Sequence, residues 1–252
     1  MGGELEGRRV LVTGAATGIG AAAVEVLSAA GAAVVAVRHR SEPPESLLER
    51  AQWLRGDLRQ AADCTRVVGE AAGLLGGLDV LVHAAGLWLP STPEALTEEE
   101  LDFLLATNVK STVFCNQAAF ERMKGGGGAI INLGSSEGVN GNPAAAAYTL
   151  TKAAVHGWTR SAARAWGQHR VTVNSLAPAV DTPGADRFRA HVGPEALPFV
   201  EQRISEAIVI GGKLGDPVRD LGPALVFLAS PGAGFITGQL LAIDGGLMML
   251  GA

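Results

Sequence analysis

The chain has 252 residues, of which 48% are hydrophobic and 18% are charged, a composition typical of a soluble globular protein. Its formal net charge of −5 provides no basic field for nucleic acid or an anionic membrane, so we expect neither partner. The acidic N-terminus does not predict a secretory signal, and no apolar stretch is long enough to predict a membrane span.

The cysteines and histidines argue against a metal site. Cys64 and Cys115 stand far apart and form no Cys-x-x-Cys, which favours two reduced thiols in a cytoplasmic protein over a disulfide or metal framework. The five histidines also lack ligand spacing. We therefore expect a cytoplasmic protein without a metal, forming a single domain over residues 1–252.

The first elements predict a strand, a glycine-rich turn and a helix. Arg9 to Thr13 is a short apolar run, and it is followed by Gly14-Ala-Ala-Thr-Gly18-Ile-Gly20 and an Ala-rich amphipathic segment to about Ala30. Such a unit points unpaired N–H groups and the positive end of a helix at a phosphate. The alternative is a tight turn with no ligand.

A second strand is predicted over residues 33–37, and it ends at Arg38-His39-Arg40-Ser41. Dinucleotide folds often carry an acidic residue here, which hydrogen-bonds the ribose and would repel a 2′-phosphate. Guanidinium groups instead pair with a phosphate through charge-assisted hydrogen bonds. The segment therefore favours NADP(H), with NAD(H) still possible, unless these cations are simply solvated loop residues.

The next elements are a strand near Trp53 to Arg55, a helix from about Ala61 to Leu75, and a fourth strand over residues 79–82. Asp57, in Gly56-Asp57-Leu58, either accepts a hydrogen bond from an adenine amino group or caps the following helix. The fourth strand ends in His83-Ala84-Ala85-Gly86, where small residues allow a ligand to approach the backbone.

Thr97 and Glu100 form a capping-box pattern that opens a long helix to about Met123. Asn108 lies inside this helix, where asparagine is unfavourable, and a solvent-facing side chain is the simplest interpretation. The fifth strand, Ala129 to Leu133, is followed by Gly134-Ser135-Ser136. Ligands of open α/β sheets bind at the carboxyl ends of such strands.

Tyr148 and Lys152 stand four residues apart in a predicted helix to about Trp166, so both side chains leave the same face. A phenol has a pKa of about 10 and is a poor base at neutral pH unless a cation stabilises its anion. Lys152 is placed to be that cation. Tyr148 is the only tyrosine in the chain. The alternative is a half-exposed tyrosine beside a solvated lysine.

After a sixth strand, Val171 to Leu176, residues 177–210 contain four prolines and predict an irregular segment with short helices. We expect it to form a lid at about 178–212. Asp216 is predicted to cap a helix to about Ala229, and Leu240 to Ile243 forms the last strand. The alternation predicts an α/β, Rossmann-like, doubly wound parallel sheet of seven strands with helices on both faces.

The order and spacing of these motifs resemble the short-chain dehydrogenase/reductase family, in particular its members of about 250 residues that act as 3-oxoacyl-carrier-protein reductases. The similarity runs from Val10 to Gly246 and rests on the glycine turn, on Asn108, on Ser135 thirteen residues before Tyr148, and on Lys152. Ile236-Thr237-Gly238 and Asp244-Gly-Gly complete it.

The resemblance implies an NAD(P)-dependent enzyme that interconverts a secondary alcohol and a ketone. Tyr148 would be the general acid/base, Ser135 would place the substrate oxygen, Lys152 would lower the tyrosine pKa and hold the nicotinamide ribose, and Asn108 would position a water leading to solvent. It also implies a homotetramer and a set of cofactor contacts: Gly14, Thr17, Gly18, Ile19, Gly20, Arg38, His39, Arg40, Asp57, Leu58, Ala84, Ala85, Gly86, Tyr148, Lys152, Pro178, Val180 and Thr182.

The chain departs from the family pattern in three places. His83-Ala84-Ala85-Gly86 replaces the usual Asn-Asn-Ala-Gly, so the asparagine hydrogen bonds must be replaced or lost. Pro178-Ala179 replaces Pro-Gly, and Thr182, the match for a carboxamide-binding threonine, comes one residue early. Glu137 is a charged residue that either faces the substrate or is solvated or helix-capping.

Two alternatives to a general alcohol/ketone oxidoreductase stay open. A 3-oxoacyl-[acyl-carrier-protein] reductase has the same chemistry but requires a basic surface for its acidic carrier, for which Arg160, Arg164 and Arg170 are candidates. A non-catalytic NADP-sensing regulatory protein would have no need for Ser135, Tyr148 and Lys152 together.

Overall fold

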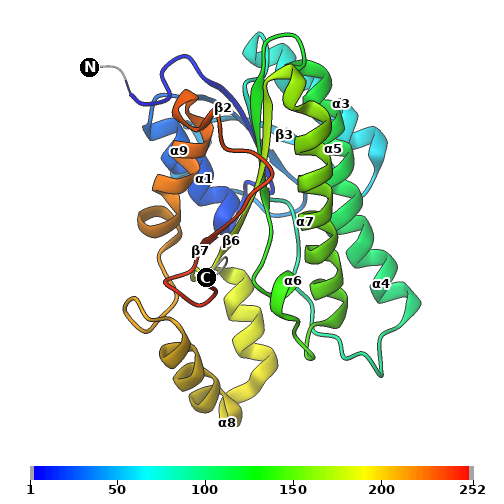
Figure 1. Cartoon of the computed structure of the whole chain (residues 1–252), viewed down its shortest axis with the longest axis vertical. Coiled ribbons are helices and arrows are strands. Elements are labelled where there is room, and N and C mark those ends of the chain that lie inside the picture. The colour runs from blue at the N-terminus through cyan, green and yellow to red at the C-terminus, as the bar shows by residue number, and fades with distance from the viewer. Residues whose placement is uncertain (1–2, 250–252) are drawn as a thin grey trace.

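A computed structural model describes residues 3–249 and shows a central sheet with helices packed on both faces (Figure 1). The seven strands pair in the order β3-β2-β1-β4-β5-β6-β7, and every pair is parallel. The predicted fold class is therefore confirmed. The strands are β1 (Arg9–Thr13), β2 (Ala33–Arg38), β3 (Gln52–Arg55), β4 (Val80–His83), β5 (Gly128–Leu133), β6 (Val171–Pro178) and β7 (Leu240–Ile243).

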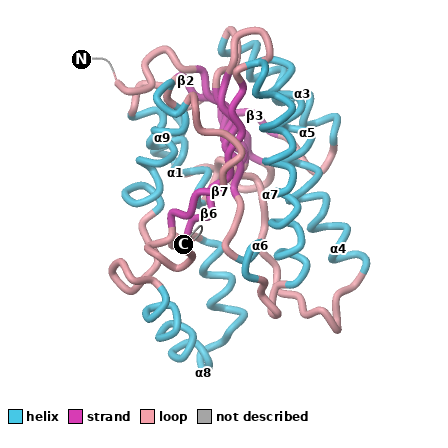
Figure 2. Tube along the Cα trace, viewed as in Figure 1, coloured by secondary structure: helices cyan, strands magenta, loops and turns pink. Residues whose placement is uncertain are grey.

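The helices form two layers (Figure 2), with α1 and α9 on one face of the sheet and α3, α5 and α7 on the other. The α-helices are α1 (Gly18–Ala29), α2 (Glu45–Leu48), α3 (Ala61–Leu75), α4 (Glu98–Leu104), α5 (Ser111–Met123), α6 (Glu137–Asn140), α7 (Ala146–Trp166), α8 (Pro183–Ala207) and α9 (Gly222–Ala229). Short π-helical turns cover Leu105–Lys110 (η1) and Pro217–Leu221 (η3), and 3₁₀ turns cover Gly167–His169 (η2) and Pro231–Ala233 (η4).

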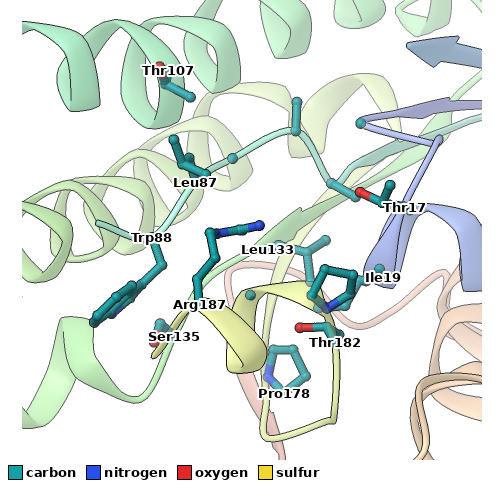
Figure 3. Close-up of a pocket in the computed structure, with 18 of the residues that line it drawn as sticks. Thr17, Ile19, Leu87, Trp88, Thr107, Leu133, Ser135, Pro178, Thr182 and Arg187 are labelled. Carbon is teal, nitrogen blue, oxygen red and sulfur yellow. The ribbon is translucent and has the colours of Figure 1, made fainter. Parts of the chain in front are cut away.

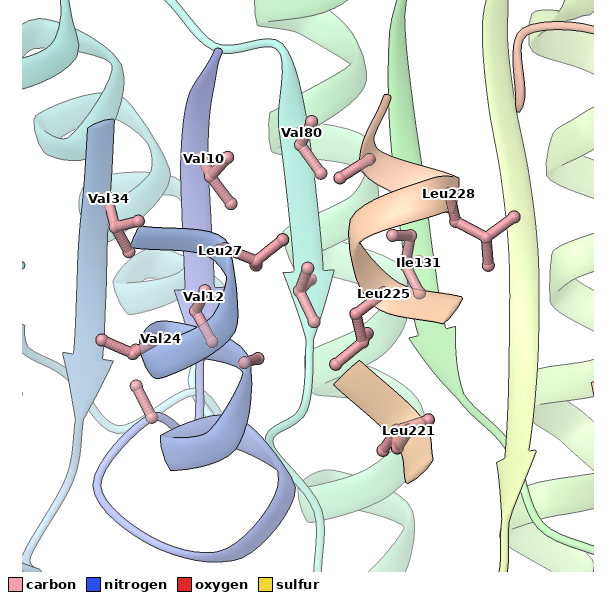
Figure 4. Close-up of a cluster of buried hydrophobic side chains, with 14 of the residues drawn as sticks. Val10, Val12, Val24, Leu27, Val34, Val80, Ile131, Leu221, Leu225 and Leu228 are labelled. Carbon is pink, nitrogen blue, oxygen red and sulfur yellow. The ribbon is translucent and has the colours of Figure 1, made fainter. Parts of the chain in front are cut away.

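Alternate residues of each strand serve the two layers of the core. Val10 and Val12 of β1 pack with Leu27 and Leu225 beneath α1 and α9 (Figure 4), whereas Leu11 packs under α3 and α5. Both faces of the strands are thus buried, which explains why they read as continuous apolar runs rather than alternating ones.

The two cysteines lie in the same core layer although they are far apart in sequence. Cys64 of α3 and Cys115 of α5 are both completely buried in the cluster between these helices and the sheet. The Cys64 thiol donates a hydrogen bond to the Leu58 carbonyl at 3.1 Å.

The strand order places a crevice at one edge of the sheet. β1 pairs with β2 on one side and with β4 on the other, so the chain reverses its direction of winding between β1 and β4. Ligands of doubly wound sheets bind outside the carboxyl ends of the strands at this point. The glycine turn after β1 and residues 84–86 after β4 therefore face the same crevice.

The long helix predicted over residues 97–123 is not continuous. The predicted capping box is confirmed, since the Thr97 hydroxyl accepts from the Glu100 N–H and the Glu100 carboxylate accepts from the Thr97 N–H. However, α4 ends at Leu104, and the π-helical turn η1 separates it from α5. Asn108 lies in this turn and is buried, so the solvent-facing interpretation is wrong. Such π turns reorient one side chain within a helix.

Two further expectations need correction. In the segment predicted to be irregular with short helices, the helices are confirmed but the irregular part is small: α8 starts with Pro183 at its first position and consists of two helices joined at Gly193, which adopts a φ of +77°. Asp57 does not cap α3, because the helix begins four residues later with Gln60 as its N-cap. In contrast, the expected cap at Asp216 is confirmed, since its carboxylate accepts from the N–H groups of Val218 and Arg219. Within residues 3–249, no helix combines the length and apolarity needed to cross a bilayer.

Candidate active site

A cavity of about 800 Å³ opens at the carboxyl ends of the strands, between the glycine turn, the β4 loop and α8 (Figure 3). All the residues that the sequence predicted as cofactor contacts line it. Ser135, Tyr148 and Lys152 line it too, whereas Asn108 lies behind its wall. The predicted candidates therefore converge on one site.

The glycine turn provides a close-packed cradle suited to a dinucleotide. Gly14 has a φ of +63°, and a Cβ there would lie 2.7 Å from the Ala85 backbone, so only glycine fits. A Cβ on Gly20 would lie 2.1 Å from the Gly14 carbonyl oxygen. The turn thus brings the first N–H groups of α1 to the cavity without side chains in the way, which is the arrangement that binds a pyrophosphate.

Cations line the end of the cavity beyond β2, and most of them are paired. Arg38 forms an ion pair with Glu42, and Arg59 binds the Asp57 carboxylate through two nitrogens at 2.8 and 2.5 Å. Hydrogen bonding from Arg59 lowers the pKa of Asp57 to about 2. Arg40 is exposed and has no carboxylate partner within residues 3–249. Sequence reasoning missed Arg59, although its position two residues after Asp57 was visible.

His83, at the position of the first asparagine of the family pattern, is hydrogen-bonded through both ring nitrogens. Its ring is buried at the end of β4, with Nδ1 3.0 Å from the Thr13 hydroxyl and Nε2 3.2 Å from the Ser111 hydroxyl. Burial lowers the pKa of His83 to about 3, so the imidazole is neutral. Because Ser111 already donates to the Thr107 carbonyl, His83 Nε2–H donates to Ser111 and Nδ1 accepts from Thr13.

This chain of hydrogen bonds reaches the cavity wall. The Thr13 hydroxyl, which donates to His83, accepts in turn from the Ala85 N–H at 3.3 Å. His83 therefore fixes the loop that carries Ala84 to Gly86, even though its own ring lies below the cavity surface.

Asn108 clamps the next part of the same loop. Its Oδ1 accepts from the Leu87 N–H at 2.8 Å, and its Nδ2 donates to the Leu87 carbonyl and to the Thr151 hydroxyl, both at 3.0 Å. A Cβ on Gly86 would lie 3.3 Å from Asn108 Oδ1 and 3.6 Å from Lys152 Nζ. The buried amide thus holds the loop backbone against the helix that carries Lys152.

The start of α7 is held by Ser91 rather than by a cap of its own. The Ser91 hydroxyl accepts from the Ala147 N–H at 3.1 Å, and its main chain pairs with Ala144 and Ala146. The N-cap position, Ala145, has no side chain that could do this. The contact fixes Tyr148 relative to the β4 loop.

Lys152 is buried, and its Nζ donates to the Leu133 carbonyl at 2.7 Å while lying 5.5 Å from the centre of the Tyr148 ring. Burial lowers the pKa of Lys152 to about 8, because an ammonium loses its hydration in the protein interior. The lysine therefore faces the phenol from one helical turn away, as its spacing in the sequence predicts.

The protein environment raises the pKa of Tyr148 above its ordinary value, in contrast to the expectation that Lys152 lowers it. Burial is the largest cause, and the negative charge of Glu137 adds to it, while hydrogen bonding to Ser135 acts in the opposite direction. Sequence analysis did not anticipate the burial of the phenol. In this environment Tyr148 is a neutral phenol at pH 7.

Ser135 is positioned by two neighbours that sequence reasoning did not connect. Its hydroxyl accepts from the Glu137 N–H at 3.1 Å, and its own N–H points at His156 Nε2, 3.4 Å away. Burial lowers the pKa of His156 to about 4, so its nitrogen is available as an acceptor. His156 stands eight residues after Tyr148, on the same face of α7.

One wall of the cavity comes from Trp88 in the β4 loop and from α8 (Figure 3). The rings of Trp88 and Phe188 meet edge to face with centroids 5.6 Å apart. Arg187 extends from α8 into the cavity in Figure 3. The irregular structure expected for residues 177–210 gave no indication of Arg187 and Phe188 as wall residues.

The chain matches known proteins over almost its full length. The model of a family described as enoyl-(acyl carrier protein) reductase matches residues 14–248. The 3-oxoacyl-[acyl-carrier-protein] reductase FabG of Vibrio cholerae is 34% identical, with 98% of this chain and 100% of that protein covered. The 2-dehydro-3-deoxy-D-gluconate 5-dehydrogenase of Escherichia coli is 32% identical, with 96% of each covered. A solved structure, the short-chain dehydrogenase/reductase from Serratia marcescens, superimposes with a TM-score of 0.84 at 32% identity, covering 97% of this chain and 99% of that one.

Proposed function

Because the chain belongs to the short-chain dehydrogenase/reductase family and is thus an oxidoreductase acting on CH–OH or carbonyl groups, we propose that it interconverts a ketone and a secondary alcohol. The observation that carries this proposal is the convergence of Ser135, Tyr148 and Lys152 on one cavity beside the glycine turn. A nicotinamide dinucleotide held in that cavity would supply or accept the hydride.

In the proposed mechanism, Ser135 and Tyr148 act on the substrate oxygen. The Ser135 hydroxyl accepts from the Glu137 N–H, and its own hydrogen, which bonds to Tyr148 here, would turn to bind and place a carbonyl oxygen. The raised pKa of Tyr148 keeps the phenol protonated, which suits it to give a proton to that oxygen during reduction. Alcohol oxidation would need the phenolate, which Lys152 and the positive nicotinamide ring of oxidised cofactor would favour.

Lys152 and Asn108 would support this chemistry from behind the cavity surface. Lys152, held by the Leu133 carbonyl, would bind the nicotinamide ribose. Asn108 would hold the loop at Gly86 and Leu87 in place, and the proposed role in positioning a water would be additional to this clamp.

The proposal predicts that Tyr148→Phe abolishes turnover and leaves NADPH binding nearly intact. The assay would follow nicotinamide absorbance with a panel of ketones and alcohols, and fluorescence would measure NADPH binding. Leu150→Ala is a suitable control, because Leu150 is exposed on the same helix. Comparable turnover by the phenylalanine variant would refute the mechanism.

We also propose that the cofactor is NADP(H) rather than NAD(H). Arg40, exposed and without a carboxylate partner in the described part of the chain, supports a phosphate site at the end of β2. The ion pair between Asp57 and Arg59 also supports this site, because Arg59 offsets the negative charge of the one carboxylate in this region that lines the cavity.

The relatives favour one narrower alternative, a 3-oxoacyl-[acyl-carrier-protein] reductase. Of the predicted basic residues, Arg164 lies roughly 24 Å beyond Tyr148 along α7, far from the cavity. Arg187, which lines the cavity, is better placed to meet an acidic carrier. Faster reduction of a 3-oxoacyl carrier protein than of the same acyl chain on a short thiol would support this function, and equal rates would contradict it.

The remaining proposals concern assembly, the lid and location. We propose a homo-oligomer, a tetramer by analogy with the family, and the full exposure of the Phe235 side chain supports a subunit contact there. We propose that α8, bent at Gly193, closes over the substrate within a single domain. A cytoplasmic location is proposed on the two unpaired thiols.

A further inference from the structure

The cavity wall beside Ser135 carries a carboxyl group for which the proposed hydride transfer has no use. Glu137 lines the same cavity as Tyr148 and Trp88. Its N–H donates to the Ser135 hydroxyl at 3.1 Å, so its main chain contacts the group that would bind the reacting oxygen. Its side chain therefore belongs to the part of the site where the substrate, rather than the adenine end of the cofactor, would lie.

One oxygen of this carboxyl group is unsatisfied. Glu137 Oε2 is buried and has no hydrogen-bond partner within residues 3–249. Burying an acceptor without a partner costs free energy, which is why nearly all buried polar groups in proteins are paired. Burial also raises the pKa of Glu137, because the charged form is disfavoured there.

Asn142 and Trp88 hydrogen-bond to the Glu137 carboxylate and partly offset the effect of burial on its pKa, yet Oε2 still has no partner among residues 3–249. Lys152, the nearest buried cation of the site, donates to the Leu133 carbonyl. Trp88 and Phe188 form an aromatic wall through their edge-to-face contact. Among the described residues, Glu137 forms no ion pair. Because Oε2 is unpaired and lines the cavity, a donor group on the substrate has an acceptor there.

We propose that Glu137 selects the substrate by accepting a hydrogen bond from a hydroxyl or ammonium group on the carbon next to the reacting carbonyl. The substrate class is then α-hydroxy or α-amino ketones, or the corresponding vicinal diols and amino alcohols, with an apolar flank against Trp88 and Phe188. This inference rests on the proposed function and adds to it the chemical class of the substrate.

The size of the expected selectivity follows from the unpaired acceptor. A site built to accept a hydrogen bond discriminates strongly against an analogue that lacks the donor, because the buried group then stays unpaired. For one buried acceptor we expect a preference on the order of 10- to 100-fold in kcat/KM.

Three ketones of nearly equal size test the inference: α-hydroxyacetophenone, α-aminoacetophenone and propiophenone. The wild-type protein with NADPH should prefer one of the first two over propiophenone by at least 10-fold, and the preferred one identifies the donor as hydroxyl or ammonium. Glu137→Val should reduce this ratio to within about 3-fold of unity, since an apolar side chain removes the acceptor. Glu137→Gln should keep part of a preference for the hydroxy ketone but lose a preference for the amino ketone. Glu99→Gln, on the exposed face of α4, is the control and should leave both preferences unchanged.

A binding measurement separates this inference from the proposed function. Calorimetry would compare 1-phenyl-1,2-ethanediol or 2-amino-1-phenylethanol with 1-phenyl-1-propanol, each titrated into the protein with oxidised NADP. If the wild type binds a donor-bearing alcohol at least 10-fold more tightly and Glu137→Val abolishes this preference, the inference is supported. This holds even if no ketone is reduced, because the absence of reduction would refute only the proposed function. Equal affinities for the alcohols, or a preference that remains in Glu137→Val, would overturn the inference. If ketones were still reduced normally, the proposed function would be unaffected.

Discussion

Replacing Asn108 by leucine tests whether this residue acts mainly as a structural clamp. The change removes the acceptor for the Leu87 N–H at 2.8 Å and the donor to the Leu87 carbonyl at 3.0 Å. Both Leu87 groups would then be left unpaired beside a buried residue, at about 1–3 kcal/mol each. We therefore expect a loss of about 2–6 kcal/mol in the free energy of unfolding, together with weaker NADPH binding through the displaced loop.

Urea unfolding at a fixed protein concentration and NADPH titration would measure these two effects. Gln117→Ala is the matched control, because it removes an exposed amide from the adjoining helix α5 and should change the free energy of unfolding by less than about 0.5 kcal/mol. If Asn108→Leu unfolds at the wild-type urea concentration and binds NADPH normally but loses kcat, the clamp argument fails. The position of an asparagine at 108 would then be explained by the water-positioning role alone.

Three further predictions concern charge. Glu137→Gln removes a negative charge that raises the pKa of Tyr148, so the acidic limb of the pH profile for alcohol oxidation should move to lower pH; an unchanged limb would contradict this electrostatic coupling. His83 has a pKa of about 3 in the folded protein and about 6.5 in the unfolded chain, so between these values only the unfolded state binds a proton there. The free energy of unfolding should therefore fall as the pH drops from 6.5 toward 3. In urea titrations, His83→Gln should reduce this slope by about 1.4 kcal/mol per pH unit near pH 5. A slope equal to that of the wild type would show that His83 is not the group responsible. Arg38→Asp combined with Arg40→Ala should shift kcat/KM toward NAD, and an unchanged NADP-to-NAD ratio would discredit the phosphate site.

The fold could be predicted from the sequence because its signals are local and regular. Apolar runs such as Arg9 to Thr13 end in glycine turns, and the strand and helix ranges predicted from them agree with the structure to within about two residues. Since both faces of the sheet are covered, these runs needed only their length and spacing to be recognised as strands.

The errors fall where backbone geometry departs from regular spacing. Nothing in the residues around Asn108 distinguishes a π-helical turn from an ordinary helix, because the extra residue per turn is stabilised by contacts with Leu87 and Thr151 from elsewhere in the chain. Four prolines made residues 177–210 look irregular, yet Pro183 and Pro194 sit at helix starts, where the ring is tolerated.

The arrangement of the site depends on contacts between distant segments. Spacing alone placed Tyr148 and Lys152 on one face, but the burial that raises the pKa of Tyr148 comes from residues around the cavity. His156 and Glu137 flank Ser135 from two different helices. No local sequence pattern predicts such a grouping, because these segments come together only when the sheet forms.

The two buried cysteines make it possible to measure local opening of the core by thiol alkylation. A thiol reagent in water cannot reach Cys64 or Cys115 while α3 and α5 remain packed on the sheet. The rate at which the folded protein becomes alkylated would therefore report how often this layer separates from the strands. Since the Leu58 carbonyl that accepts from Cys64 belongs to a residue lining the cofactor cavity, slower alkylation with dinucleotide present would measure how far binding tightens this layer.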